Sequence, residues 1–212
     1  MKTIPAILIT GDATDQLARA RDLLKWCRQL DGTEVEHIAV SAGYNDTFLT
    51  KYSYNRANCL PAKMLRLAAT LYAGKPFMWL EPDSIPIRPG WLRHMTAAYY
   101  KEGKEFLMPA LDESQKHDKG WRGEFGSGIG IYGPNTHWRV PDEFPTWGWD
   151  KFIYDDLNRL GLVAFTGLVQ HSYCDYDNED RPYLFPRDLD VLKPETEVFH
   201  ADKHQSLIGY TQ

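Results

Sequence analysis

The sequence has few cysteines and no long apolar run. Its 212 residues include three cysteines, Cys27, Cys59 and Cys174, with no Cys-x-x-Cys pair, which argues against a disulfide framework or a zinc site. No apolar run approaches the ~18 residues that span a bilayer, and the N-terminal run is too short for the core of a signal peptide. We therefore expect reduced thiols and a soluble, cytoplasmic protein with no membrane partner.

An excess of basic residues is also absent. The chain carries 24 Lys and Arg against 29 Asp and Glu, a formal net charge of −5, so it lacks the overall basic footprint that dominant nucleic-acid binding requires. A local basic patch stays compatible with this balance. A hydrophobic fraction of 43% and a charged fraction of 25% are those of an ordinary globular protein. Because domains commonly hold ~100–200 residues, we expect one domain over residues 1–212.

The order of the first apolar segments predicts an α/β fold that begins as strand, helix and strand. Residues 5–11 and 35–40 read as buried strands. The segment between them reads as a helix, with Thr14 or Asp12 as its N-cap and Gly32 after its end. The apolar positions of this helix are Leu17, Ala20, Leu24 and Cys27.

Further helices and strands alternate along the rest of the chain. A helix begins at Pro61 and ends before Gly74, with Met64, Leu67, Ala68 and Leu71 on its inward face. A later helix covers residues 150–160, with Ile153, Leu157 and Leu160 inward. The remaining predicted elements are strands over 77–81, 106–111, 126–133 and 163–169 and a helix that carries Leu92, Met95, Ala98 and Tyr99.

The strand over residues 77–81 ends in two carboxylates one residue apart, Glu81 and Asp83. Ligands bind at the carboxyl ends of strands in open α/β sheets, and oxygen ligands suit Mg²⁺ or Mn²⁺, which can neutralise a diphosphate. Near the end of the chain, His200 and Lys203 add an imidazole and an ammonium group. Together these groups indicate an enzyme that handles a nucleotide diphosphate, although carboxylates that only cap a turn would give the same pattern.

Residues 77–92, Phe-Met-Trp-Leu-Glu-Pro-Asp-Ser-Ile-Pro-Ile-Arg-Pro-Gly-Trp-Leu, resemble the D-x-D region of nucleotide-sugar-dependent glycosyltransferases with the GT-A architecture. That family has an apolar strand, the acidic motif, a short second strand and a helix in this order. The resemblance implies an α/β fold with a mixed, mostly parallel, Rossmann-like sheet flanked by helices. It also implies that Asp83 binds the metal directly and that Glu81 assists, through water or the donor ribose. The motif here is Glu81-Pro-Asp83, a departure that weakens the ribose role more than the metal role.

The same resemblance assigns roles near the C-terminus and in the second half of the chain. His200 and Lys203 are similar in placement to the histidine that completes the metal shell and the lysine that binds the diphosphate in retaining, glycogenin-like members. Asp150 resembles the general base of inverting members, with Asp142 or Glu143 as substitutes and a plain helix N-cap as the alternative. Retention and inversion of the anomeric configuration both stay open.

The resemblance also implies a nucleotide-sugar half over about 1–92 and an acceptor half over about 93–212. The expected donor-binding residues are Thr10, Gly11, Asp12, Lys63, Arg66 and Lys203. The expected acceptor-binding residues are Ser127, Gly128, Trp147, Trp149, Trp121 and Arg122. For the glycines at 126–130, a tight crossing of strands explains the pattern as well as an acceptor does.

The resemblance implies a UDP-sugar as donor and Mn²⁺ or Mg²⁺ as cofactor. The acceptor is either a saccharide or a modified base, such as a 5-hydroxymethylpyrimidine in phage DNA, in which case the location is the host cytoplasm. Residues 51–56 and 116–122 mix cations with aromatics, as a loop facing nucleic acid would. A rival metal cluster consists of His171, Asp175 and Asp177.

Two other functions fit parts of the sequence. A sugar-phosphate nucleotidyltransferase shares the first half of this architecture, but it needs a glycine-rich, basic loop after the first strand. Residues 10–16 hold one glycine and no basic residue, which disfavours that function. A non-catalytic module that binds a saccharide or a nucleotide is the third alternative.

Overall fold

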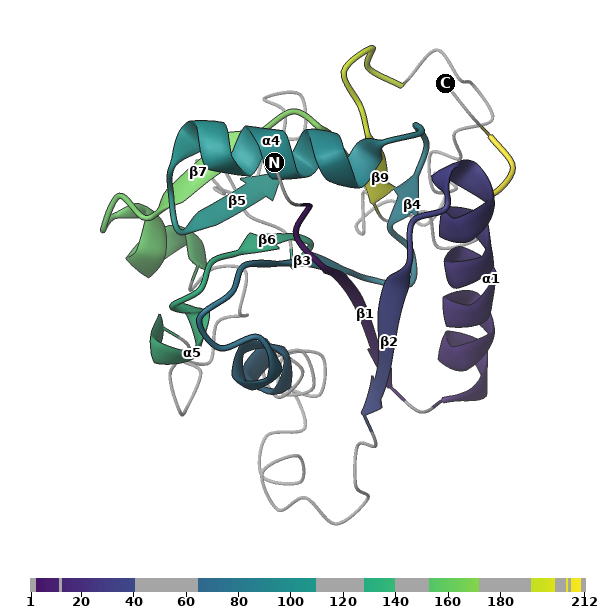
Figure 1. Ribbon diagram of the computed structural model, residues 1–212, viewed down its shortest axis with the longest axis horizontal. Helices are drawn as coiled ribbons and strands as arrows, with labels where there is room; N and C mark the ends of the chain where they lie inside the picture. The colour runs from purple at the N-terminus through teal and green to yellow at the C-terminus, as the bar shows by residue number, and fades with distance from the viewer. Residues whose placement is uncertain are drawn as a thin grey trace, which may run out of the picture.

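A six-stranded sheet forms the centre of the protein (Figure 1). The structure is a computed structural model, and it describes residues 3–11, 13–40, 65–109, 128–139, 153–171, 192–200, 205 and 207–210. The strand order is β2-β1-β3-β6-β5-β7. In chain order the strands are β1 (Ala6–Gly11), β2 (Val35–Val40), β3 (Phe77–Leu80), β5 (Phe106–Pro109), β6 (Gly130–Tyr132) and β7 (Val163–Thr166).

The central sheet is mixed and mostly parallel. β1 pairs in parallel with both β2 and β3, and β5 pairs in parallel with β7. β6 runs antiparallel between β3 and β5. This arrangement confirms the predicted α/β fold class. The parallel group β2-β1-β3 brings the carboxyl ends of β1 and β3 to the same edge of the sheet.

A second, three-stranded sheet lies beside the first, in the order β4-β9-β8. Its strands are β4 (Ile85–Pro86), β8 (Val169–His171) and β9 (Val198–His200). β9 is antiparallel to β4 and parallel to β8. The prediction of one strand over residues 163–169 is wrong, because a turn at Gly167 and Leu168 divides that segment between β7 and β8, which belong to different sheets.

Helices cover both faces of the central sheet (Figure 1). α1 (Thr14–Asp31) and α4 (Trp91–Glu102) pack on one face, and the helix over residues 65–71 packs on the other. In the described part of the second half of the chain, two shorter helices follow, α5 (Thr136–Arg139) and the π-helix η3 (Ile153–Asn158). None of the helices in the described ranges has the length and apolar character needed to cross a membrane.

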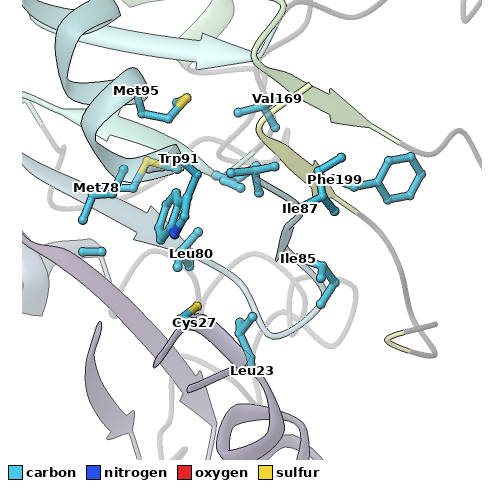
Figure 2. Close-up of a cluster of buried hydrophobic side chains, with 14 of the residues drawn as sticks. Leu23, Cys27, Met78, Leu80, Ile85, Ile87, Trp91, Met95, Val169 and Phe199 are labelled. Atoms are coloured by element: carbon cyan, nitrogen blue, oxygen red, sulfur yellow. The ribbon is translucent and has the colours of Figure 1, made fainter. Parts of the chain in front are cut away.

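Side chains alternate between two hydrophobic clusters because successive residues of a strand point to opposite faces. Leu8, Met78 and Leu80 pack with α1 and α4, whereas Ile7 and Trp79 pack against the helix over 65–71. The first cluster extends into the small sheet. Figure 2 shows its members Leu23, Cys27, Met78, Leu80, Ile85, Ile87, Trp91, Met95, Val169 and Phe199.

The boundaries of α1 are partly as predicted. Gly32 follows the last residue and adopts a left-handed conformation, with φ of 76°, while its N–H donates to the Arg28 carbonyl. The predicted N-caps are wrong. Ala13 occupies that position in an extended conformation and makes no side-chain cap, and Thr14 is already the first helical residue.

The predicted inward faces of two later helices need correction. In the helix over 65–71, Leu67 and Leu71 are 36% and 57% exposed, while the buried residues include Leu65 and Ala68. The buried face is therefore displaced by about one residue from the predicted one, and the small Ala68 allows close packing on the sheet. Leu160 is 62% exposed and lies beyond η3, whose wider turn changes the helical phase.

Candidate metal centre

A tight turn places the two carboxylates at the end of β3. The Ser84 N–H donates to the Glu81 carbonyl at 3.0 Å, which closes a four-residue turn over Glu81-Pro82-Asp83-Ser84. Pro82 suits the second position of such a turn because its φ is fixed near −65°. The Glu81 N–H in turn donates to the Ser84 hydroxyl at 3.2 Å. The chain then enters β4, so buried strands hold both sides of the turn.

The neighbouring strand β9 brings His200 to this turn. β9 pairs antiparallel with β4, with Phe199 opposite Ile85 and Val198 opposite Pro86. Continued by one residue, the same register sets His200 opposite Ser84. Ile85 and Phe199 are 0% and 2% exposed, so core packing fixes the position of the strand that carries the imidazole.

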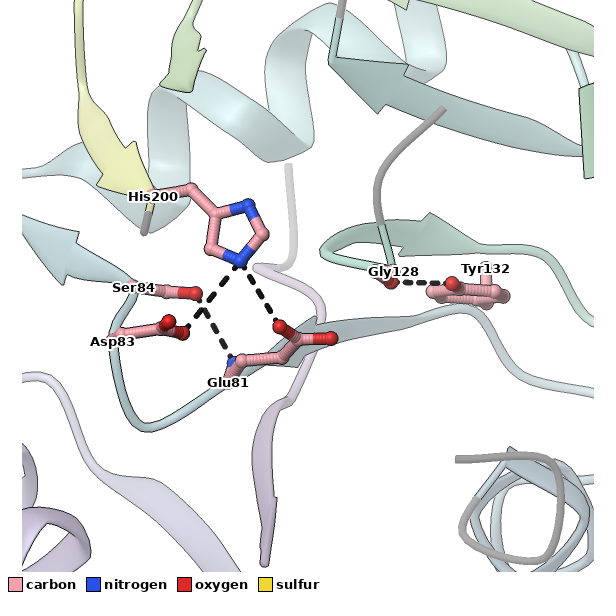
Figure 3. A network of polar contacts seen from close by, with 6 residues as sticks. All are labelled: Glu81, Asp83, Ser84, Gly128, Tyr132 and His200. Atoms are coloured by element: carbon pink, nitrogen blue, oxygen red, sulfur yellow. Dashed lines mark hydrogen bonds and ion pairs between the residues drawn. The ribbon is translucent and has the colours of Figure 1, made fainter. Parts of the chain in front are cut away.

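The side chains of Glu81, Asp83 and His200 converge on one point (Figure 3). The His200 Nε2 atom lies 3.0 Å from Glu81 Oε2 and 3.6 Å from Asp83 Oδ1. Potential ligand atoms of all three residues lie within 4.8 Å of one another. Asp83 and His200 are buried, whereas the Glu81 side chain is 30% exposed. The cluster is therefore closed towards the core and open to solvent beside Glu81.

This donor set fits a divalent cation. Metal–ligand bonds of about 2.1 Å at right angles put neighbouring donors about 3.0 Å apart, close to the separations around His200 Nε2. Two carboxylates suit Mg²⁺ or Mn²⁺, and an imidazole is a common ligand of first-row transition metals. Two acidic side chains at a partly buried site repel each other, and a cation would remove that cost. The geometry thus fits the predicted ligand set of Glu81, Asp83 and His200.

The carboxyl end of β1, next to β3, holds two of the predicted donor-binding residues. The Thr10 hydroxyl is 3.0 Å from His37 Nε2, and the Gly11 N–H donates to Gln16 Oε1 at 2.7 Å. Burial lowers the pKa of His37, which favours the neutral imidazole as the partner of Thr10. Arg66 lies partly buried on the helix over 65–71, on the other face of the sheet from α1. Donor binding by these residues stays a prediction.

The glycine-rich segment that leads into β6 has a structural explanation at one position, Gly130, the first residue of that strand. A Cβ atom on Gly130 would lie 2.7 Å from the Leu107 carbonyl oxygen and 2.7 Å from Met108 Sδ, so the close crossing of β5 requires glycine there. The Gly128 carbonyl accepts a hydrogen bond from the Tyr132 hydroxyl (Figure 3). Contact between Gly128 and an acceptor stays a prediction.

The remaining predicted site residues lie outside the described part of the chain. Of the rival metal cluster, only the backbone of His171 is described, at the end of β8. The segments 51–56 and 116–122 are also outside it. The other predicted site residues outside the described part are Asp12, Lys63, Trp121, Arg122, Ser127, Asp142, Glu143, Trp147, Trp149, Asp150, Asp175, Asp177 and Lys203.

One residue of the acidic turn, Ser84, and one residue that contacts only the end of β1, Gln16, have roles that were not predicted. Ser84 stabilises the turn through its hydroxyl, and a serine directly after an acidic turn is the sequence signal that could have indicated this role. Gln16 fixes the end of β1 through a contact between side chain and backbone. A single glutamine near the start of a helix carries no comparable signal.

Comparisons with protein-family models and with curated protein sequences find no match. Solved structures do match. Mouse xyloside xylosyltransferase 1, in its apo form, gives a TM-score of 0.55 at 10% identity and covers 96% of this chain and 99% of that chain. A glycosyltransferase involved in the glycosylation of the major capsid of PBCV-1 gives 0.52 at 11% identity, with 93% and 92% covered.

The apo-form glycosyltransferase GlyE of Streptococcus pneumoniae TIGR4 gives a TM-score of 0.54 at 11% identity; the match covers 94% of this chain and 54% of GlyE. All three similar proteins are glycosyltransferases, and two of them match over nearly their whole length. At such low identity the likeness shows the architecture. This chain therefore has the GT-A-like glycosyltransferase fold that its Glu81-Pro82-Asp83 segment predicted.

Proposed function

We propose that this protein is a metal-dependent glycosyltransferase that moves a sugar from a nucleotide-diphosphate sugar to an acceptor hydroxyl. The observation that carries the proposal is the convergence of Glu81, Asp83 and His200 at the carboxyl end of a central strand. That end of an α/β sheet is where ligands bind. The GT-A-like fold, shared with three glycosyltransferases, gives this cluster a chemical context.

In this proposal the three side chains have different roles, which follow from how deeply each is buried. Asp83 and His200 are held by the core and fix the position of the cation, while the more exposed Glu81 faces the side from which a diphosphate would approach. A bound cation supplies positive charge that stabilises the departing diphosphate. His200 offers Nε2 to the same point as the carboxylates, so it binds a metal in its neutral form.

The finer parts of the proposal concern groups outside the described residues. Lys203 would add a second positive charge for the diphosphate, and Asp150 would take the proton of the attacking hydroxyl. An Asp150 base corresponds to inversion of the anomeric configuration. The configuration of the product, read by nuclear magnetic resonance, therefore tests that role directly.

For the substrates, we propose a UDP-sugar as donor and two acceptor classes to compare. The first is DNA that carries 5-hydroxymethylpyrimidines, supported by the mixture of cations and aromatics in residues 51–56 and 116–122. The second is a simple saccharide. A protein with a net charge of −5 repels a polyanion such as DNA but does not repel a neutral sugar.

The direct test is a donor screen with Mn²⁺ against hydroxymethylated DNA and simple sugars. We expect the Asp83→Asn variant, which keeps the size of the side chain, to lose turnover by on the order of 10²-fold, the scale for losing a group that stabilises transition-state charge. The matched control is Asp156→Asn, which changes a half-exposed carboxylate on η3 that pairs with Arg159. The control should keep full turnover.

Three results would contradict the proposal. Equal turnover of Asp83→Asn and the unmodified protein would remove the metal role. Formation of a nucleotide-sugar from a nucleoside triphosphate and a sugar phosphate would identify a nucleotidyltransferase instead. Tight binding of a nucleotide-sugar with neither transfer nor hydrolysis, with or without metal, would indicate a binding module.

A further inference from the structure

A glutamine near the C-terminus reaches the turn that carries the two carboxylates. The Gln205 side-chain nitrogen, Nε2, donates to the Pro82 carbonyl at 2.8 Å and to the Arg19 carbonyl on α1 at 2.9 Å. Pro82 is 123 residues away in sequence and Arg19 is 186 residues away. One amide group therefore joins α1, the acidic turn and the C-terminal segment.

The orientation of this amide follows from its partners. Both partners are carbonyl oxygens, which only accept hydrogen bonds, so the NH₂ end of Gln205 must face them. An amide nitrogen has two hydrogens, and each carbonyl takes one. The contact to Pro82 is therefore a donated hydrogen bond of ordinary length.

The Pro82 carbonyl belongs to the central peptide group of the turn, and this gives the contact its importance. Rotation of that peptide group interconverts type I and type II turns, and a type II turn requires a positive φ at the third residue, Asp83. Among the described non-glycine residues only Gln205 has a positive φ, so the turn is not of type II. By holding the Pro82 carbonyl, Gln205 keeps the backbone at Asp83 in its present conformation.

The backbone around Gln205 is fixed by its own contacts, so its side-chain amide has a defined position beside the turn. Its φ of 52° lies in the left-handed region, which non-glycine residues seldom adopt. Its carbonyl accepts the Ile208 N–H at 3.1 Å, and Leu207, two residues further on, is 2% exposed within the main hydrophobic cluster. The core therefore fixes the segment from which the amide reaches the turn.

We infer that Gln205 is a positioning residue that sets the direction of the Asp83 carboxylate, and through it the affinity of the metal centre. This inference rests on the proposed metal site. Gln205 touches neither carboxylate in the described structure; it acts on the peptide group that precedes Asp83. Outer partners of metal ligands commonly change metal affinity about 10- to 100-fold when they are removed.

The test compares Mn²⁺ affinity, measured from the electron paramagnetic resonance signal of free Mn²⁺, in four proteins. Gln205→Met keeps the length of the side chain but removes both N–H donors, and we expect its Mn²⁺ dissociation constant to rise about tenfold. Gln16→Met is the matched control, since it removes an amide contact to the backbone of Gly11 without touching the turn. Its Mn²⁺ affinity should equal that of the unmodified protein, and Asp83→Asn should lose binding.

The outcomes distinguish a failure of the proposed metal site from a failure of the proposed role of Gln205. If Asp83→Asn binds Mn²⁺ as well as the unmodified protein does, the metal site fails and the inference fails with it. If binding depends on Asp83 but Gln205→Met retains full affinity, or loses no more than Gln16→Met, only the role of Gln205 is overturned. Thermal unfolding in EDTA shows whether each variant is folded.

A second measurement is made on the unmodified protein, so its result does not depend on whether a variant folds. Both side-chain amide protons of Gln205 donate to carbonyls, so we expect them to exchange with solvent more slowly than those of Gln29, which is exposed on α1. Nuclear magnetic resonance of the side-chain amides gives both rates. Exchange as fast as that of Gln29 would overturn the contact itself.

Discussion

The Nε2 atom of His200 lies 3.0 Å from Glu81 Oε2, although 119 residues separate the two in sequence. A cation held by both residues would bind only to the folded chain and would therefore stabilise it. We expect Mn²⁺ at ~100 times its dissociation constant to raise the melting temperature by about 5–10 °C. Differential scanning calorimetry with and without EDTA measures this rise.

The His200→Ala variant should lose most of that rise. His94→Ala is the control, because it removes a histidine that is bound to Glu197 and not to the metal centre. It should melt at a lower temperature yet keep the Mn²⁺-dependent rise. A full rise in His200→Ala would exclude His200 from the ligand set.

The pair of His94 and Glu197 provides a test of stability at the small sheet. His94 Nδ1 lies 3.1 Å from Glu197 Oε1, and the Glu197 side chain is only 6% exposed. In His94→Ala, this buried carboxylate oxygen loses its described partner, which should cost about 1–3 kcal/mol of unfolding free energy. Urea unfolding measures the loss. Because the residues interact, His94→Ala combined with Glu197→Gln should cost less than the sum of the two changes.

A control for this pair is available on the surface. Arg28 and Glu34 form a salt bridge of 2.7 Å, but their side chains are 69% and 72% exposed. Solvent screens such pairs, so Arg28→Ala should leave the unfolding free energy nearly unchanged. Equal losses in His94→Ala and Arg28→Ala would show that burial of Glu197 has no effect on stability.

Gly130 gives a prediction about packing between β5 and β6. The added methyl group of Gly130→Ala would meet the Leu107 carbonyl oxygen at 2.7 Å, and backbone must move to accommodate it. We expect a loss of about 1–3 kcal/mol, as for overpacked cores. In Gly167→Ala, the nearest atom would be Glu195 Oε1 at 3.6 Å, an ordinary contact, so the change should stay within about 0.5 kcal/mol. Urea unfolding of both variants compares them directly.

The buried thiol of Cys27 should resist chemical modification. Burial first, and the nearby Asp31 charge second, raise the pKa of Cys27 from 9.0 to about 12. Because the thiolate is the reactive form, iodoacetamide at pH 8 should label Cys27 only after the protein unfolds. Mass spectrometry of the Cys27 peptide, with and without urea, measures the labelling. Rapid labelling of the native protein would contradict the burial of this residue.

The same shift in pKa has a consequence for stability at high pH. The folded protein holds the Cys27 proton more firmly than the unfolded chain does, so unfolding free energy should decrease as pH rises from about 9 towards about 12. Below about pH 9 this contribution should be constant. Comparing the pH dependence of the unmodified protein with that of Cys27→Ala isolates this contribution.

The parts of the fold that the sequence predicted are those with a strong local signal. β1 and β3 are short apolar runs buried on both faces, which is typical of strands in the middle of a parallel sheet. Gly32 marked the end of α1 because only glycine readily adopts a left-handed conformation there. Glu81 and Asp83, the carboxylates of the candidate metal centre, could be singled out because they follow a fully apolar strand.

Other features depend on tertiary contacts that no local pattern contains. The division of residues 163–169 between two sheets follows from a turn at Gly167 and Leu168 within a mostly apolar segment. Leu67 and Leu71 suggested a buried face, but the buried residues of this helix are Leu65, Ala68 and Ala69, of which only Ala68 was predicted. Gln205 acts through two backbone carbonyls that are distant in sequence, so only the folded chain reveals its role.

The pairing of β9 with β4 is brief, and the identity of the proposed metal ligand depends on it. The described ladder contains only two residue pairs, Ile85 with Phe199 and Pro86 with Val198. Neighbouring residues of a strand point to opposite faces, so a shift of one position would exchange the imidazole for the benzyl ring of Phe199. Insertion or deletion of a single residue in β9 would thus remove the imidazole from the proposed metal site while leaving the large central sheet intact.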